Sequence, residues 1–292
     1  MVKNDILEAI VTDDTPYRKN LEIPDSIGFG YEVEMGVTEE NFDSICKNFS
    51  FPGWSRTTDP SIETLFGLEL ISPVYRNSKN TYKELKAISE YLSKYEKDFS
   101  WASFQLNIDN IFSNKEDMYN FLCFFAAYED ILYHFCQGKD THIRHNAFRF
   151  SNTIGKVMYK SKNYDEAFEK LHNRKDISLN LKKNYMSVPK IIEFRQPNGT
   201  DDCWLWQNYT NVFINSMLAI KNNKNIDYDK VRNYLKRFKK STEGIPYDHI
   251  LKVSKAFEFC DIIFQNDKDK LYFMKQYLNG LSDKKILQLK DE

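Results

Sequence analysis

The chain has 292 residues, enough for one large domain or two modest ones with a sizeable apolar core. Its 41 basic and 42 acidic side chains give a net charge of −1, so no overall field favours a polyanion. We therefore expect neither a nucleic-acid partner nor an anionic membrane surface, although the more basic part at 221–292 leaves a weak polyanion contact open.

The cysteines are odd in number and scattered, without a Cys-x-x-Cys pair, which argues against a zinc knuckle or a disulfide framework. No N-terminal signal pattern is present, and charged residues interrupt the most apolar run, at 121–135. These features predict a soluble protein of the reducing cytoplasm.

Residues 1–26 are polar and contain Pro16 and Pro24, so we expect a short helix or an extended arm there. The first core strand follows at 28–36. Because strand side chains alternate between faces, Glu32 and Glu34 point to the same side of this strand. Two adjacent carboxylates are typical of a divalent-metal site, although a half-buried edge strand with a solvated acidic face has the same pattern.

After a helix that begins at Thr38, residues 54–59 predict a short strand that ends in a turn at 59–61. A second core strand at 67–73 places the lone carboxylate of Glu69 among apolar residues. This region therefore adds a third acidic side chain to the predicted sheet.

An amphipathic helix at 80–97 leads to a third strand at 102–109, where Gln105 and Asn107 share one face. A long apolar helix follows at 115–137 and is expected to pack across the sheet. The basic and aromatic stretch at 142–150 is interpreted as a loop.

A short helix is expected at 163–175, and then a fourth strand at 187–195 with Glu193 and Arg195 on one face. A turn at 197–200 leads into a helix that runs to about residue 219. Beyond it the composition changes to amphipathic Lys- and Asn-rich segments without a strand signal, at 227–240, 246–264, 267–279 and 281–289.

Together these elements predict an α+β fold in which helices cover one face of a curved, mainly antiparallel sheet. We divide the chain into an N-terminal arm (1–26), a main domain (27–222) and a helical C-terminal extension (223–292). The other face of the sheet collects side chains that can hold Mg²⁺ and phosphate. They are Glu32, Glu34, Glu69, Gln105, Asn107, Glu193 and Arg195.

The order and spacing of several short motifs resemble the amidoligase family of the glutamine synthetase-like carboxylate-amine ligase superfamily. The resemblance covers roughly residues 27–222. Each motif is weak alone, but the ordered set is fairly specific. The motifs are Phe-Gly-x-Glu-x-Glu at 29–34, Trp54 with Asp59 and Ser61, Gly-Leu-Glu-Leu-Ile-Ser-Pro at 67–73, the polar strand at 104–109, Ser-Leu-Asn-Leu at 178–181, and Ile-Glu-Phe-Arg at 192–195 followed by Gly199 and Thr200.

The resemblance implies a glutamine synthetase-like catalytic fold and ATP-dependent joining of a carboxylate to an amine through an acyl-phosphate. The carboxylate and amine substrates would include a peptide, a protein or an amino acid. Carried over by position, Glu32, Glu34, Glu69 and Glu193 would hold Mg²⁺ or Mn²⁺ on the ATP phosphates, and Arg195 would stabilise the transferred phosphoryl group, with Glu193 and Arg195 as the catalytic pair. Such chemistry depends on metal and guanidinium charges more than on a protein nucleophile.

Arg149 and Arg144 could clamp a phosphate or a substrate carboxylate, since a guanidinium pairs with both in a bidentate manner. A solvated basic turn is the alternative interpretation of this stretch. Asp59, in the Trp54–Ser61 motif, is a further candidate for substrate or phosphate binding.

The chain departs from the family pattern on the third strand, where Gln105 and Asn107 replace the usual His-x-His pair. Amide oxygens also ligate Mg²⁺, so we include both residues among the candidate metal ligands. The departure is equally compatible with another substrate or with a catalytically inactive relative that binds a peptide or nucleotide. A metal-dependent nuclease is a third hypothesis, but Ile71 stands where such enzymes usually have a lysine.

Overall fold

The computed structural model describes residues 3–12, 18–62, 66–137, 148–161, 163–171, 174, 176–182, 190–222, 226–236 and 250–291. Arg144, most of the expected loop at 142–150 and the first part of the expected strand at 187–195 lie outside these residues.

The core of the fold is a seven-stranded sheet with the strand order β2-β3-β1-β5-β7-β6, and β4 pairs with β1 beside this path. Every strand pairing is antiparallel, which confirms the predicted α+β class with a mainly antiparallel sheet. The strands are β1 (Phe29–Val37), β2 (Ser55–Thr58), β3 (Phe66–Ile71), β4 (Lys97–Asp98), β5 (Phe104–Asp109), β6 (Leu179–Lys182) and β7 (Ile191–Phe194).

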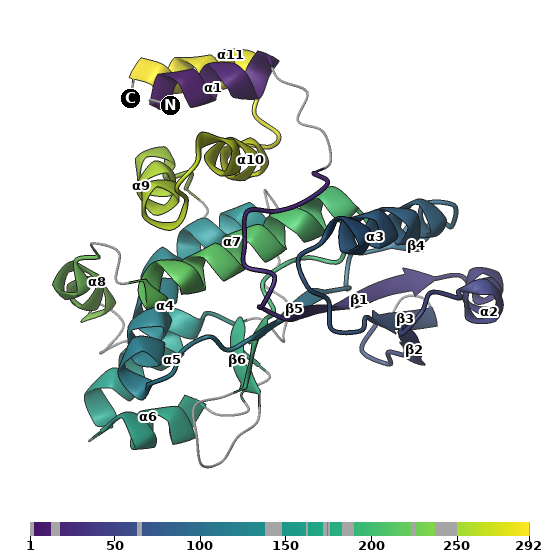
Figure 1. Cartoon of the computed structure of the whole chain (residues 1–292), viewed down its shortest axis with the longest axis horizontal. Helices are drawn as coiled ribbons and strands as arrows, with labels where there is room; N and C mark the ends of the chain where they lie inside the picture. The colour runs from purple at the N-terminus through teal and green to yellow at the C-terminus, as the bar shows by residue number, and fades with distance from the viewer. Residues whose placement is uncertain are drawn as a thin grey trace.

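Helices cover one face of this sheet, and Figure 1 shows α3 and α7 lying across it. In the same view α1, α9, α10 and α11 lie beyond α7, furthest from the strands. The helices are α1 (Lys3–Thr12), α2 (Glu39–Asn48), α3 (Lys79–Leu92), α4 (Lys115–Gln137), α5 (Phe150–Lys160), α6 (Tyr164–Leu171), α7 (Cys203–Lys221), α8 (Tyr228–Leu235), α9 (Val253–Ile263), α10 (Asp267–Tyr277), α11 (Asp283–Gln288) and the 3₁₀ turn η2 (Leu289–Asp291).

The alternation of side chains along β1 separates the two faces of the sheet. Tyr31, Val33 and Met35 are buried in the core, where the ring of Tyr31 lies against Trp206 of α7 and its hydroxyl hydrogen-bonds Thr210. Glu32 and Glu34, between them in sequence, point to the opposite face. The apolar half of the strand thus fixes the direction of its acidic half.

Helix α5 is an element that the sequence analysis did not predict. Its N-cap residue, Arg149, offers no side-chain cap, and Ser151 begins a run of residues that commonly favour turns. The backbone N–H groups of Phe150 and Ser151, in the first turn of the helix, donate instead to Glu129 of α4, at 2.6 and 2.9 Å. Because this cap comes from a residue distant in sequence, no local signal announces the helix.

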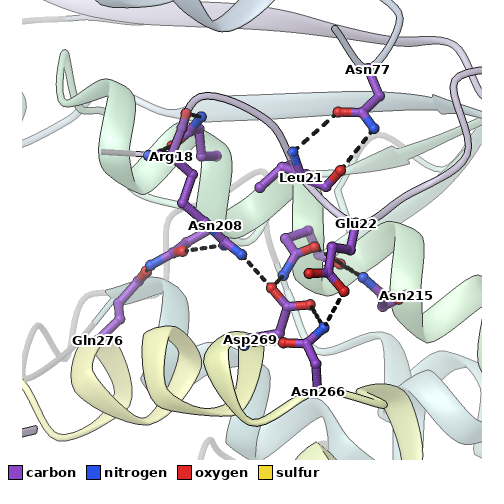
Figure 2. A network of polar contacts seen from close by, with 11 residues as sticks. Arg18, Leu21, Glu22, Asn77, Asn208, Asn215, Asn266, Asp269 and Gln276 are labelled. Carbon is purple, nitrogen blue, oxygen red and sulfur yellow. Dashed lines mark hydrogen bonds and ion pairs between the residues drawn. The ribbon is translucent and has the colours of Figure 1, made fainter. Parts of the chain in front are cut away.

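The two ends of the chain pack on the central helix α7 through a buried polar network (Figure 2). The guanidinium of Arg18 pairs with Asp269 of α10 and donates to Asn208 of α7 at 3.2 Å. Asn211 of α7 donates to the same aspartate at 2.8 Å, and Arg18 also lies 4.1 Å from the ring centre of Tyr272. In addition to this polar network, one continuous hydrophobic cluster includes residues of both the N-terminal helix and the C-terminal helices.

Along the part of the chain that the structure describes, no helix combines the length and the apolar character that crossing a membrane requires.

Candidate functional site

Strand register brings most of the predicted site residues onto one face of the sheet, which we call the polar face. Glu34 on β1 lies opposite Glu69 on β3, and Glu32 lies opposite Gln105 on β5. Directly opposed side chains on neighbouring antiparallel strands project to the same side with Cβ atoms about 5 Å apart. The acidic residues of two separate motifs and the amide of a third therefore meet on adjacent strands.

The same register extends the polar face across β7 and β6. Glu193 on β7 lies between Asn107 on β5 and Asn180 on β6, each directly opposite it. Arg195 follows two residues later and reaches back to Glu193, with its NH1 3.1 Å from Oε1. Five of the sheet's strands thus contribute side chains to one continuous surface.

A chain of hydrogen bonds connects these side chains. Gln105 Nε2 donates to Glu34 Oε1 at 2.6 Å, and Gln105 Oε1 accepts from Arg195 NH1 at 2.7 Å. Glu34 Oε2 also accepts from the backbone N–H of Ser103 at 2.8 Å. Gln105 therefore uses both ends of its amide to hold a carboxylate and a guanidinium in place.

Two amide oxygens of the polar face have no hydrogen-bond partner among the described residues. Asn107 donates to Glu32 at 2.8 Å and Asn180 donates to Glu193 at 2.5 Å, yet the Oδ1 atoms of both asparagines are buried without a donor. An unpaired buried acceptor costs about 1–3 kcal/mol. Unpaired acceptors beside carboxylates favour a cation or an N–H donor as the missing partner.

The carboxylates of this face suit a hard divalent cation in their chemistry, because Mg²⁺ prefers carboxylate and amide oxygens. Within the described residues, no group of three His, Cys, Asp or Glu side chains is close enough to hold a metal ion. The donor sets are smaller: the opposed pair Glu34 and Glu69, and Glu193 beside the unpaired oxygen of Asn180. Two carboxylates, or one carboxylate and an amide, leave room for the phosphate and water oxygens that usually complete a Mg²⁺ shell.

Arg149 lies apart from this network, in a buried ion pair with residues of α4. Its NH2 is 2.6 Å from Asp130 Oδ1, its Nε is 3.8 Å from Glu129 Oε2, and its side chain is 2% exposed. Burial raises the pKa of Glu129 above its ordinary value, and the nearby guanidinium opposes that rise. In this arrangement the guanidinium of Arg149 connects α4 to the start of α5.

Asp59 forms part of the turn that joins β2 to β3. Its carboxylate accepts from the N–H of Ser61 at 2.9 Å, and its own N–H donates to the carbonyl of Gly67 at 2.9 Å. A Cβ at Gly67 would come within 1.9 Å of the Asp59 carbonyl oxygen, so the turn requires glycine there. Arg144, the remaining candidate, lies outside the described residues.

Sequence reasoning assigned no role to Asn180 or Ser103, although both contact the carboxylates of the polar face. Asn180 stood in the Ser-Leu-Asn-Leu motif between two buried leucines, and this period-two alternation could have identified both its strand and its face. Ser103 contacts Glu34 through its backbone N–H, and a pattern of side chains in the sequence cannot predict such a contact.

No family model matches this chain, and no curated protein matches it either.

Proposed function

We propose that this chain is an ATP- and Mg²⁺-dependent carboxylate-amine ligase that forms an amide bond through an acyl-phosphate. The observation that carries the proposal is the position of Arg195 on the polar face, where its guanidinium lies between Glu193 and Gln105. The opposed carboxylates Glu34 and Glu69 lie on the same face. A fixed cation among oxygen donors is the arrangement that phosphoryl transfer requires.

The architecture is compatible with a glutamine synthetase-like catalytic fold. Helices cover one face of an antiparallel sheet and leave the other face to polar residues, as the motif resemblance implies. The motifs that carry that resemblance, distant in sequence, also supply the side chains of this face.

In the proposed reaction, an oxygen of the substrate carboxylate attacks the γ-phosphorus of ATP and ADP leaves. The amine nitrogen then attacks the acyl carbon, so that a C–N bond forms, the C–O bond to phosphate breaks, and phosphate and a proton leave. Bound Mg²⁺ ions would neutralise charge on the ATP phosphates. Glu34 and Glu69, with Glu32 next to them on β1, would hold one ion, and Glu193 beside Asn180 would hold another.

Arg195 would bind the transferred phosphoryl group. Its NH1 is already held by Glu193 and Gln105, so the guanidinium needs little reorganisation when negative charge develops near it. Gln105 orients Arg195 and Glu34 together, and Asn180 orients Glu193. The network thus pre-organises the charged groups of the site.

A catalytically inactive relative that binds a peptide or nucleotide is the second candidate function. One observation favours it: the amide of Gln105 donates a hydrogen bond to Glu34 and accepts one from Arg195. Both charged side chains thus already have a hydrogen-bond partner within the protein. In such a protein the polar face would bind a ligand without turning it over.

Release of ADP separates these candidates when the protein is incubated with ATP, Mg²⁺ and a panel of amino acids and small amines. The ligase account predicts ADP release that depends on both a carboxylate and an amine and that stops with EDTA. It also predicts that Glu34→Gln and Arg195→Ala each lower turnover at least 100-fold, since one electrostatic donor of this kind contributes 10²–10³-fold.

Matched controls are Glu90→Gln and Arg174→Ala, whose charged groups are exposed and pair with Lys86 and Asp176, outside the network of the polar face. Both controls should keep wild-type turnover, and circular dichroism should show that all four variants are folded. Nucleotide binding without turnover in the wild type would favour the inactive relative, and full turnover in a folded Arg195→Ala variant would contradict the ligase account.

A further inference from the structure

A pocket of about 160 Å³ lies at one end of the polar face, beside the Glu32–Asn107 pair. Gly28, just before β1, and Gly30 of β1 form part of its wall, and β5, β7, the end of β3 and the residues that follow β3 contribute the remainder. The lining residues are Gly28, Phe29, Gly30, Tyr31, Ile71, Ser72, Pro73, Val74, Asn107, Ile108, Asp109 and Ile191.

The hydrogen-bonding capacity left to the side chains that line this pocket consists of acceptors. The Tyr31 hydroxyl pairs with Thr210, and the Ser72 hydroxyl accepts from the N–H of Tyr31 and donates to the carbonyl of Pro73. Asn107 Oδ1, in contrast, is buried without a partner among the described residues. A ligand that carries N–H donors would therefore supply the hydrogen bond that Asn107 Oδ1 lacks.

The charges around the pocket favour a cation at this acceptor. Asp109 lines the pocket, and Glu32 is held by the amide of Asn107 at 2.8 Å. The only base paired with Asp109 among the described residues is Arg76, at 3.5 Å, and its side chain is 52% exposed, so solvent screens this pair. Asp109 therefore brings a negative charge to the pocket that its exposed partner Arg76 offsets only weakly.

Apolar side chains supply the remaining part of the pocket. Ile71 and Pro73 line it from the end of β3, while Val74 and Ile191 are large apolar residues of the lining that remain 71% and 36% exposed. Covering such side chains with an apolar group is favourable by about 25 cal/mol per Å². The lining therefore combines a polar end, at Asn107, with an apolar surface.

We propose that this pocket binds a primary alkylammonium group of the size of a lysine side chain, with its nitrogen at Asn107 Oδ1 and its methylenes against Ile71, Val74 and Ile191. A cavity of about 150 Å³ holds a molecule of about six heavy atoms, such as benzene, and n-butylammonium has five. A primary alkylamine is protonated at neutral pH, as the lysine side chain is. Identifying this ligand as the amine substrate rests on the proposed function, but the binding itself does not.

The test uses n-butylammonium chloride with the full-length protein at pH 7 and in EDTA, so that no divalent ion competes for the same oxygen. Titration is followed by ¹H–¹⁵N correlation spectra, with n-butanol and butyrate as probes of equal length. Butylammonium should bind at least tenfold more tightly than either probe, because a hydrogen bond to a charged group contributes about 1.5–3 kcal/mol.

Two substitutions at one position distinguish a contact at the Asn107 oxygen from a change of fold. Asn107→Leu removes the acceptor and should weaken butylammonium binding about tenfold, whereas Asn107→Asp adds a negative charge and should strengthen it. Asn180→Leu is the matched control, because it removes the other unpaired amide oxygen outside this pocket, and it should leave the affinity unchanged.

The proposal is overturned if butanol binds as tightly as butylammonium, or if folded Asn107→Leu and Asn107→Asp variants both keep the wild-type affinity. These results are independent of ligase activity. Butylammonium binding without ADP release would support the ammonium pocket and contradict the ligase proposal. ADP release without butylammonium binding would support the ligase proposal and contradict the ammonium pocket.

Discussion

Single amides organise the charges of the polar face. The side chain of Gln105 joins Glu34 to Arg195, and that of Asn107 holds Glu32. An amide can donate and accept at once, so one residue donates to a carboxylate and orients a guanidinium. A neutral imidazole has one donor and one acceptor nitrogen, whereas the amide of Gln105 has a second N–H and donates to Ser103 Oγ as well, at 3.3 Å.

We predict that Gln105→Leu lowers the free energy of unfolding by about 1–3 kcal/mol, because Glu34 and Arg195 would each lose a buried hydrogen bond. Urea denaturation measures this difference. The control is Asn48→Leu, which removes an exposed amide on α2 and should change the value by less than about 0.5 kcal/mol. Equal stability of the two variants would show that the Gln105 bridge does not hold the network.

At the level of residues, alternation along strands was enough to predict which side chains share the polar face. It could not predict their partners, because cross-strand hydrogen bonds depend on register between segments as distant as Glu34 and Gln105. Arg149 shows the same limit, since the carboxylates that hold it come from the interior of the long helix α4.

Elements with a strong internal period were predicted well. The helix expected at 115–137 has those bounds in α4, and the N-cap expected at Thr38 accepts from the N–H of Asn41. Helix α3 ends at Leu92, earlier than the expected 97, because residues 97–98 form the short strand β4 against β1. Such a two-residue pairing has no recognisable sequence period.

Strand order was not predictable from the chain. β5, the strand that carries Asn107, lies between β1 and β7 and pairs with both. This strand order brings the motifs of Glu32 and Glu193 onto one face of the sheet. Sequence order alone would allow several other arrangements of these antiparallel strands.

At the scale of the whole molecule, both chain ends are packed on the main domain. Arg18 and Asp269 are separated by most of the sequence, yet their side chains are 5% and 4% exposed and pair above α7 (Figure 2). The sequence analysis treated the two ends as separate from the main domain, because composition changes there. Composition cannot show that a buried ion pair joins them.

We predict that Arg18→Met destabilises the protein by about 3–5 kcal/mol, because it leaves the carboxylate of Asp269 buried without its guanidinium. The double variant Arg18→Met/Asp269→Asn should recover part of this loss, since it removes the buried charge and keeps an amide of similar size. Urea denaturation of both, with Glu90→Ala of the exposed Lys86–Glu90 pair as control, provides the test. A double variant less stable than Arg18→Met would contradict a role for the buried charge.

The most direct test of the ligase account is a crystal structure of the full-length protein with Mg²⁺ and a non-hydrolysable ATP analogue. The account predicts metal density at the carboxylates of Glu34 and Glu69, with Glu32 next to them, and at Glu193 beside Asn180, with the terminal phosphate within reach of Arg195. A nucleotide bound away from the polar face, or a polar face without metal at saturating Mg²⁺ and analogue, would contradict it.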